Sequence, residues 1–372
     1  MELMYPIDYS KAVSNRGNNA RIKDVMERAK KGEKLTIAFL GGSITQGSLA
    51  TCTERCYAYR VYRWWCETFP DAEFTYVNGG IGGTTSQFGA ARADSDILAF
   101  KPDFVIIEYS VNDESTEHFE ETYEGVVRKV YGSEGKPAVM IVHNVYYNNG
   151  SSAELMHARI ARHYNIPAVS MQSTIYPELL AGRIENRSIT PDDLHPNDDG
   201  HELVASVITY GLTQIMNAPA DEPLKEFPEP LTVNSYEDSV RYQNYNCSPD
   251  CKGFEADDSE QNGITDCFKN GWTAWNKGDE ITFEIEGSSV GVQFRKSVRL
   301  PAPVAELTID DDENGKLILD ANFDETWGDK LELYTAAEHI GKGKHKVKIK
   351  ITESHDNDAV PFYLVSVIGS GR

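Results

Sequence analysis

The sequence predicts a three-layer α/β/α domain that is followed by an all-β sandwich. Between residues 35 and 216, short apolar runs rich in β-branched side chains alternate with segments of helical periodicity. Such alternation is typical of a parallel sheet that helices cover on both faces. After residue 280, apolar and polar residues alternate with period two between turn residues, which is typical of antiparallel strands.

A segment rich in proline and acidic residues, NAPADEPLKEFPEPLTVN at 217–234, separates the two patterns. We therefore expect a first domain over residues 1–218, a linker over 219–232 and a second domain over 233–372. A chain of 372 residues is also long enough for two domains.

Five strands are expected in the first domain. The first, LTIAFLGG, is an apolar run that stops at two glycines, and the others are EFTYVN, DFVIIEYS, PAVMIVHNV and AVSM. Their near-continuous apolar character indicates strands that are buried on both faces. The expected strands cover residues 35–42, 73–78, 103–110, 137–145 and 168–171.

Stretches of helical periodicity precede the first strand and follow each strand. The first of them, NNARIKDVMERAKK, repeats apolar residues at helical spacing and stops at Gly32. Trp64 and Trp65 fall at apolar positions of the second helix and are expected in the core. The expected helices cover residues 18–31, 57–69, 86–100, 116–131, 152–165 and 197–216.

The second domain shows period-two alternation in ITFEIEGSSVGVQF, AELTIDDDENGKLILD and KHKVKIKITES. Asn314-Gly315 lies within the second of these stretches and predicts a hairpin turn between two strands. The acids before it imitate the start of a calcium loop. Ala321 stands where such a loop requires an acid, however, so a hairpin is the better interpretation.

The chain is strongly acidic, with a net charge of −22 from 36 basic and 58 acidic residues. Such a surface repels nucleic acid and anionic lipid, and it suits a neutral or cationic small substrate. No apolar run approaches the ~20 residues that span a bilayer, and the N-terminus lacks the basic start and apolar core of a signal peptide. We expect no nucleic-acid or membrane partner and a cytoplasmic location, and the oligomeric state stays open.

Cysteines and clustered acids raise the alternative of a bound metal. The pairs Cys52/Cys56 and Cys247/Cys251 are loosely spaced and no histidine pattern completes a zinc site, so reduced, packed thiols are expected. Acidic residues also crowd His195, but they belong to the start of a helix, where acids are common. We therefore expect no metal and no cofactor. The residues around His195 are Asp193, Asp198, Asp199 and His201.

Chemically versatile residues follow four of the expected strands. Ser43 comes directly after Gly41-Gly42, which permit a tight turn and leave its hydroxyl unshielded; alternatively, Ser43 only caps the next helix. The loop VNGGIGGTTS (77–86) offers backbone N–H groups, YSVND (109–113) offers an amide, and PDDLHPNDDGH (191–201) places an acid three residues before a histidine. Because functional groups of open α/β sheets gather beyond the carboxyl ends of the strands, these segments predict an acyl-transfer site.

These four blocks, in this order, resemble the SGNH (GDSL-type) hydrolase superfamily over most of the first domain. The resemblance implies a flavodoxin-like parallel sheet and a serine hydrolase that works through an acyl-enzyme. It implies Ser43 as the nucleophile, His195 as the general base and Asp192 as the residue that orients His195. It also implies an oxyanion hole made of the N–H groups of Ser43 and Gly83 and the side-chain amide of Asn112.

The chain departs from the superfamily pattern at two positions. Gly42 stands where an aspartate is usual, and Ser110 stands where a glycine is usual. Neither change removes a group that does chemistry. Two assignments stay open: Asp193 is an alternative to Asp192 as the orienting acid, and His143 either lines the substrate pocket or is a structural histidine.

The second domain is similar to the jelly-roll carbohydrate-binding modules, including those of the family-35 type, that are often joined to SGNH esterases. This resemblance rests on the strand pattern and on the closing FYLVSVIGS. Aromatic faces stack on sugar rings, so Trp272, Trp275 and Trp327 are candidates for substrate binding. Trp327 is preferred because its loop, NFDETWGDK, is polar, whereas Trp272 and Trp275 are alternatively core residues.

An α/β domain followed by a sandwich, without a leader, is similar to the carbohydrate esterases of family 17, intracellular deacetylases of mannan-derived oligosaccharides. The resemblance implies a serine acetylesterase acting on acetylated manno-oligosaccharides, particularly at the axial 2-hydroxyl of mannose. An acetylxylan esterase, another acyl esterase or a thioesterase on the same scaffold is the alternative among enzymes. A non-catalytic glycan-binding protein is the alternative of another class, and the complete set of expected catalytic residues argues against it.

Overall fold

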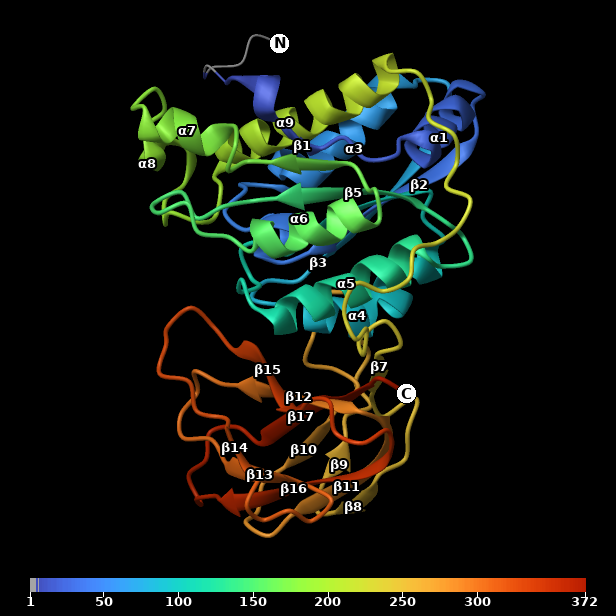
Figure 1. The fold of residues 1–372 in the computed structure, drawn as a ribbon. Coiled ribbons are helices and arrows are strands. Elements are labelled where there is room, and N and C mark those ends of the chain that lie inside the picture. The colour runs from blue at the N-terminus through green and yellow to red at the C-terminus, as the bar shows by residue number, and fades with distance from the viewer. Residues whose placement is uncertain (1–4, 6) are drawn as a thin grey trace. The chain divides into compact units, whose positions relative to one another are not determined.

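The computed structural model describes Tyr5 and residues 7–372 of the chain. The chain forms two compact units, of which the first ends at Asn234 and the second runs from Ser235 to Arg372 (Figure 1). The predicted start of the second domain, residue 233, lies two residues before this division. Each unit has a hydrophobic core of its own.

A six-stranded sheet of order β1-β6-β5-β4-β2-β3 forms the middle layer of the first unit. The strands β2 to β6 run parallel, as predicted, and β1 pairs antiparallel with β6 at one edge. The edge strand β1 was not predicted, because three residues are too few to show a period. The strands are β1 (Val13–Asn15), β2 (Lys34–Gly41), β3 (Glu73–Gly80), β4 (Phe104–Glu108), β5 (Ala138–His143) and β6 (Ala168–Ser170).

Helices cover both faces of this sheet, which confirms the three-layer prediction. The helices α4, α5 and α6 pack side by side on one face, and α1, α3 and α9 cover the other (Figure 1). The three short helices α2, α7 and α8 lie in segments that follow strands. The helices are α1 (Ala20–Lys30), α2 (Ser43–Gln46), α3 (Tyr57–Thr68), α4 (Ser86–Asp96), α5 (Glu117–Tyr131), α6 (Glu154–His163), α7 (Ile175–Leu180), α8 (Asn186–Ile189) and α9 (Asp198–Asn217).

The middle strands explain the apolar runs of the sequence. Every residue of β4 and β5 is buried, because each strand has a helix layer on both sides. Trp65 is buried and packs against Phe104 with ring centroids 5.3 Å apart, whereas Trp64 is half-buried at the edge of the core. In the described part of the chain, no helix combines the length and the apolar character needed to cross a bilayer.

The segment predicted as a linker lies on the first unit. The ring of Phe227 is 5.5 Å from that of Tyr164, and the carboxylate of Glu124 accepts hydrogen bonds from the N–H groups of Leu231 (2.6 Å) and Thr232 (2.7 Å). Residues 219–234 have no helix or strand, in keeping with their proline content, but these contacts anchor them to the α/β layers. The segment is therefore part of the first unit and not a free tether.

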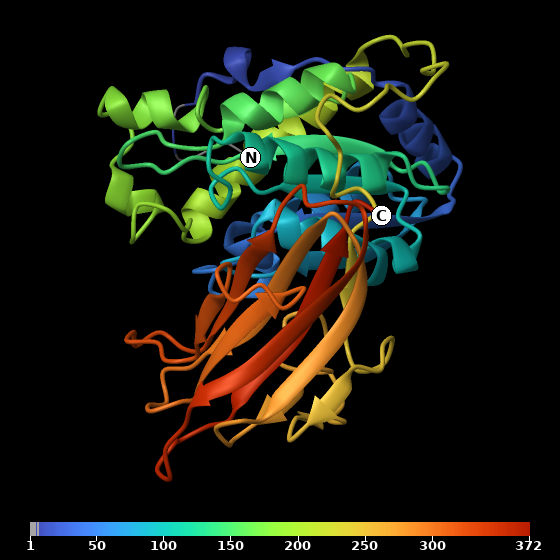
Figure 2. The ribbon, with the colours of Figure 1, turned by 60° about the horizontal axis from the view of Figure 1, so that its bottom comes forward.

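The second unit is a sandwich of two antiparallel sheets, as predicted (Figure 2). One sheet has the order β15-β12-β17-β10-β9, with β7 also on β17, and the other has the order β14-β13-β16-β11-β8. Side chains from both sheets form one core between them. The strands are β7 (Val240–Tyr242), β8 (Asp250–Lys252), β9 (Glu255–Ala256), β10 (Trp272–Ala274), β11 (Glu280–Gly287), β12 (Ser289–Lys296), β13 (Val304–Ile309), β14 (Leu317–Asp320), β15 (Lys330–Ala337), β16 (Gly343–Glu353) and β17 (Phe362–Ser370).

The predicted hairpin around Asn314-Gly315 joins β13 to β14, which pair antiparallel. The acids of this turn are engaged by basic side chains. Asp310 accepts a hydrogen bond from the ring of His345 (2.7 Å), and Asp311 pairs with Lys346 (2.9 Å). These contacts give the acidic turn a structural explanation that involves no calcium ion.

Candidate active site

The nucleophile candidate sits at the junction of β2 and α2. A Cβ at Gly41 would lie 2.2 Å from Thr45 Oγ1 and 2.5 Å from the carbonyl oxygen of Glu108. A Cβ at Gly42 would lie 2.1 Å from Asn112 Oδ1. All three distances are far below van der Waals contact, so a side chain at either position would require its neighbours to move. The unusual Gly42 is thereby explained, because it makes room for the amide of Asn112.

Three side chains form a continuous hydrogen-bonded chain beyond this junction. His195 Nε2 lies 2.8 Å from Ser43 Oγ, and His195 Nδ1 lies 2.6 Å from Asp192 Oδ2. The other oxygen of Asp192 accepts hydrogen bonds from the backbone N–H groups of His195 (2.7 Å) and Leu194 (3.1 Å). The structure thus brings together the three residues that the sequence predicted as catalytic, over 152 positions of chain.

The carboxylate of Asp192 is held in its charged form. Partial burial raises its pKa, but the hydrogen bonds from the His195 ring and from the two backbone N–H groups lower it more, so the pKa lies below its usual value. A carboxylate that stays charged keeps the proton of His195 on Nδ1, and Nε2 then faces Ser43 as an acceptor.

Asp193, the alternative orienting acid, has other partners. Its carboxylate accepts hydrogen bonds from Asn186 Nδ2 (2.6 Å) and Arg187 Nη2 (2.9 Å). Asp192 is therefore the acid that contacts the imidazole, and the alternative is wrong.

Asn112 lies in the turn that follows β4, as expected. Its backbone N–H and that of Asp113 both donate to the carbonyl oxygen of Tyr109 (3.0 Å each). The carboxylate of Asp113 accepts the N–H of Ser86 (2.9 Å) and contacts the buried ring of His157 (3.0 Å). Asn112 Oδ1 lies buried beside Gly42 and has no hydrogen-bond partner among the described residues. This oxygen is an acceptor, so the predicted role of Asn112 in an oxyanion hole depends on its amide N–H group.

Ser110, which stands where a glycine is usual, has a structural role under this turn. Its hydroxyl donates to Glu108 Oε1 (3.0 Å) and accepts the N–H of Asn144 (2.7 Å). All three side chains are fully buried. Burial raises the pKa of Glu108 to about 7, although the hydrogen bonds from Ser110 act in the opposite direction. Ser110 therefore ties the end of β4 to the segment that follows β5.

The glycine-rich loop after β3 lies beside α2. Gly82 donates its N–H to Gln46 Oε1 (2.6 Å), and a Cβ at Gly82 would lie 3.6 Å from Ser43 Cβ. Gly83 has φ +69°, a left-handed conformation that favours glycine, and a Cβ there would meet no heavy atom within 4 Å. Gly83 therefore borders open space near the nucleophile, where the oxyanion hole was predicted.

Two side chains that support the site were not predicted from the sequence. Gln46, named above, holds the glycine-rich loop. Arg92 of α4 is fully buried and donates to the carbonyl oxygens of Gly79 (2.6 Å) and Gly41 (3.0 Å), so it joins the ends of β3 and β2 beneath the site. Its signal in the sequence was an arginine between two alanines, Ala91 and Ala93, in the expected helix.

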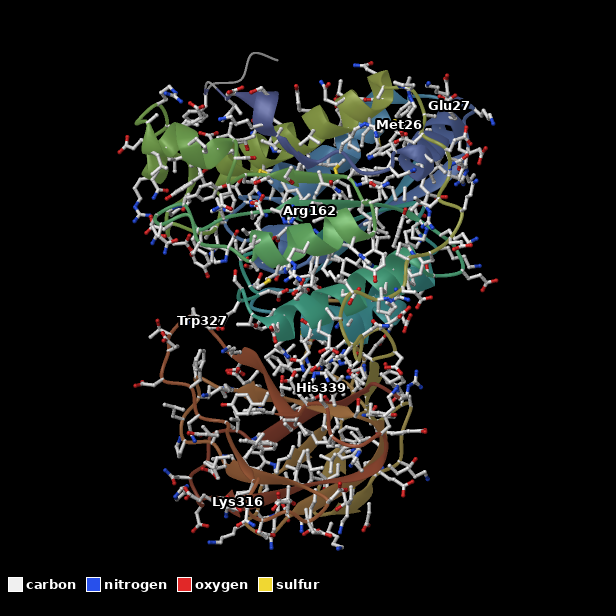
Figure 3. All side chains as sticks on the ribbon, viewed as in Figure 1. Met26, Glu27, Arg162, Lys316, Trp327 and His339 are labelled. Atoms are coloured by element: carbon white, nitrogen blue, oxygen red, sulfur yellow. The ribbon has the colours of Figure 1, made fainter. Side chains whose placement is uncertain are left out.

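The two predicted substrate-binding residues differ in exposure. His143 at the end of β5 is fully buried, its ring centroid is 6.3 Å from that of His157, and burial holds its pKa well below the usual value. The prediction that His143 lines an open pocket is therefore wrong. Figure 3 shows Trp327 projecting from the loop between β14 and β15, with 65% of its surface exposed. Its role in binding sugar stays a prediction. Of the other two tryptophans, Trp272 is in the core and Trp275 is exposed.

The residues that suggested a metal have other partners. Asp198 accepts the N–H (2.9 Å) and the hydroxyl (2.7 Å) of Thr51, and burial lowers the pKa of His201 to about 4. All six cysteines are free thiols, but Cys52 and Cys251 are exposed, so the prediction of packed thiols is wrong for these two. Across Tyr5 and residues 7–372, no group of three or more His, Cys, Asp and Glu side chains is arranged to hold a metal ion.

Comparisons with known proteins agree with this geometry. The GDSL-like Lipase/Acylhydrolase family matches residues 39–203, which include Ser43, Asn112 and His195. A crystal structure of a two-domain esterase (CEX) active on acetylated mannans is 65% identical, with a TM-score of 0.96 and 99% of both chains covered.

Two further matches are informative. A crystal structure of a two-domain esterase (CEX) active on acetylated mannans, co-crystallized with mannopentaose, is also 65% identical, with a TM-score of 0.95 and 99% of both chains covered. The acetylxylan esterase of Geobacillus stearothermophilus is 28% identical over an alignment of 212 residues, and the match covers 47% of this chain and 91% of that protein.

Proposed function

Because the chain belongs to the GDSL-like lipase/acylhydrolase family, we propose that it is a serine esterase that removes O-acetyl groups from acetylated manno-oligosaccharides. The observation that carries the chemistry is the hydrogen-bonded chain from Asp192 through His195 to Ser43. The observation that supports the substrate is the 65% identity, over both units, to an esterase active on acetylated mannans.

The reaction begins with the transfer of a proton. His195 Nε2, 2.8 Å from Ser43 Oγ, takes the hydroxyl proton as the oxygen attacks the acetyl carbonyl carbon. The imidazolium that forms is stabilised by Asp192, whose carboxylate lies 2.6 Å from Nδ1. The carbonyl π electrons move to the carbonyl oxygen, which becomes an oxyanion.

The oxyanion is held by N–H donors from three chain segments. They are the backbone N–H groups of Ser43 and Gly83 and the side-chain amide of Asn112. When the tetrahedral intermediate collapses, the sugar oxygen leaves with the proton of His195, and Ser43 keeps the acetyl group. A water molecule then gives its proton to His195 and attacks this ester, and acetate leaves as Ser43 regains a proton.

A neutral oligosaccharide suits the strongly acidic chain, since it experiences no net Coulomb repulsion from a charge of −22. We propose the axial 2-hydroxyl of mannose as the position that is deacetylated, in line with the sequence resemblance. The exposed Trp327 offers an aromatic face for a sugar ring.

A second candidate substrate is an acetylated xylo-oligosaccharide. It is favoured by the similarity of the first unit to the acetylxylan esterase of Geobacillus stearothermophilus. Other acyl esters or thioesters are the broader alternative on this scaffold. A non-catalytic glycan-binding protein is disfavoured. A protein that only binds sugar does not need a serine, a histidine and an aspartate that are joined by hydrogen bonds.

The decisive experiment compares acetylated manno-oligosaccharides with acetylated xylo-oligosaccharides at equal acetyl concentration. Loss of acetate is followed by mass spectrometry, and the position that loses it is assigned by NMR. We expect the manno-oligosaccharides to be deacetylated faster, first at the 2-position. Faster deacetylation of xylo-oligosaccharides, or preference for an octanoyl over an acetyl model ester, would replace the proposed substrate with one of the alternatives.

A further inference from the structure

The turn that carries the acid and the base contains an unusual backbone conformation. Asp193, between Asp192 and His195, has φ +70°. This left-handed region costs energy for residues with a side chain, because Cβ approaches the following carbonyl oxygen, and aspartate adopts it when its carboxylate has local hydrogen bonds. A turn of this shape needs support from its surroundings if it is to be the dominant conformation.

The side chain of Asp193 receives that support from α8. Arg187 forms a two-pronged contact, with Nη1 2.8 Å from Oδ1 and Nη2 2.9 Å from Oδ2. Asn186 Nδ2 adds a third donor, 2.6 Å from Oδ1. The backbone N–H of Tyr147 donates to the carbonyl oxygen of Asp193 (2.8 Å). Four contacts therefore fix Asp193, although the acid that contacts the imidazole is Asp192.

The helix α8 is also fixed to the chain on either side of the same turn. Arg187 Nη1 donates to the carbonyl oxygen of Pro191 (3.1 Å), just before the turn. After the turn, Asn197 donates its side-chain amide to Ser188 (2.9 Å) and its backbone N–H to Ile189 (2.9 Å). The segment from Pro191 to Asn197 is thus anchored on α8 at its start, at Asp193 and at its end.

We propose that Asn186 and Arg187 are positioning residues that clamp Asp193 in its left-handed conformation and thereby hold Asp192 and His195 in line with Ser43. The proposal rests on the proposed function, because it assigns the clamp to the same hydrolytic site. It goes beyond that function because it makes turnover depend on two residues that lie outside the hydrogen-bonded chain of Asp192, His195 and Ser43.

The exposure of Arg187 separates this role from a general stabilising one. The Arg187 side chain is 55% exposed, so solvent screens its ion pair and limits what the pair contributes to the stability of the fold. The alignment of a general base is much more sensitive, since a displacement of about 1 Å at a reacting group can cost on the order of 10² in rate. We therefore expect loss of the clamp to lower kcat strongly and the melting temperature little.

A double-mutant cycle tests the clamp through the backbone of Asp193. Arg187→Met removes the fork, and Asp193→Ala removes the carboxylate but keeps Cβ; each is expected to lower kcat by about tenfold or more. Asp193→Gly removes the carboxylate and also the strain, because glycine adopts φ +70° freely. We expect Asp193→Gly to retain most of the activity that Asp193→Ala loses.

The decisive comparison is the effect of Arg187→Met on kcat in the wild-type protein and in the Asp193→Gly variant. In the Asp193→Gly background, Arg187→Met is expected to change kcat by less than about twofold, since the glycine turn needs no clamp. An equal loss of kcat in both backgrounds would overturn the proposal. Thermal melting of each variant shows whether a loss is due to unfolding, and KM, which a positioning residue does not set, is expected to stay unchanged.

Arg63→Met is a matched control for Arg187→Met, and Ser43→Ala tests the proposed function separately. Arg63→Met removes an arginine of similar exposure (53%) from its ion pair with Glu67 and is expected to leave kcat unchanged. Dependence of activity on Ser43 is measured alongside with Ser43→Ala. If Ser43→Ala were active, the proposed function would fail; if it is inactive while the cycle is additive, only the clamp fails.

Discussion

Asn112 supplies the side-chain donor of the proposed oxyanion hole, and its position depends on the missing Cβ of Gly42. We expect Asn112→Ala to lower kcat by about 10²–10³, the usual effect of losing one such donor. KM on an acetylated substrate is expected to change little, because the donor acts on charge that develops in the transition state. Steady-state kinetics on an acetyl ester measures both constants. A loss confined to KM would place Asn112 in ground-state binding instead.

Glu108 gives the site a pH-dependent stability. Burial raises its pKa from 4.5 to about 7 in the folded state. Between these values the folded chain binds more protons at this group than the unfolded chain, so the free energy of unfolding falls as the pH rises. The loss is complete above pH 7 and amounts to about 3 kcal/mol.

We expect Glu108→Gln to remove this dependence, because an amide keeps an acceptor for Ser110 and does not ionise. The variant is expected to be more stable than the wild type at pH 8 and closer to it at pH 4.5. Urea unfolding at the two pH values measures the difference. Glu134→Gln, in an exposed turn, is the control. Equal pH dependence of the wild type and Glu108→Gln would contradict the assignment.

At the scale of elements, the site depends on how α2 and the loop after β3 are joined. Gln46, the last residue of α2, accepts the N–H of Gly82 at 2.6 Å. We expect Gln46→Leu to lower kcat by about tenfold or more, since the N–H of Gly83 then loses its fixed position. Gln46→Glu keeps an acceptor and is expected to retain most of the activity.

The comparison of these two variants is the test of the loop contact. Gln214→Leu, an exposed position of α9, is the control for the substitution itself and is expected to have no effect on kcat. If Gln46→Glu and Gln46→Leu lose activity equally, the hydrogen bond to Gly82 is not what positions the loop.

The major elements of the first unit could be predicted because they bury continuous surfaces. The run before Ser43 lies in a strand covered on both faces, and the stretch around Trp65 packs one face on the sheet. The short elements could not be predicted in this way. β1 and α8 have three and four residues, too few for a period, and their places are set by tertiary contacts such as those of Arg187.

The catalytic residues could be predicted from the sequence more completely than the residues around them. Ser43, Asn112 and His195 each follow a recognisable strand or turn, so their convergence at one edge of the sheet follows from the parallel topology. Exposure could not be predicted for His143, because the end of β5 lies under the layer that contains His157. Nor does spacing reveal that Gln46 reaches Gly82, since that contact joins segments 36 positions apart.

At the scale of the whole molecule, we propose that an exposed aromatic residue of the second unit binds sugar. Trp327 is 65% exposed. We expect Trp327→Ala to raise KM for an acetylated manno-oligosaccharide several-fold, since stacking of a sugar ring is lost. Turnover of a small acetyl ester, which has no sugar ring to stack, is expected to stay unchanged.

Tyr245→Ala provides the matched control, because Tyr245 is also exposed (63%) and lies in the same unit. Equal effects of the two substitutions, or no effect of Trp327→Ala on either substrate, would contradict the binding role of Trp327. Both measurements use the full chain.

The proposed mechanism requires Ser43 to receive the acetyl group from the substrate. The most direct measurement mixes the enzyme with an acetylated manno-oligosaccharide, quenches the reaction in acid during turnover and maps the chain by peptide mass spectrometry. We expect one acetyl group, on the peptide that contains Ser43, and neither the label nor acetate release from Ser43→Ala. Release of acetate by Ser43→Ala at a rate near that of the wild type would contradict the account.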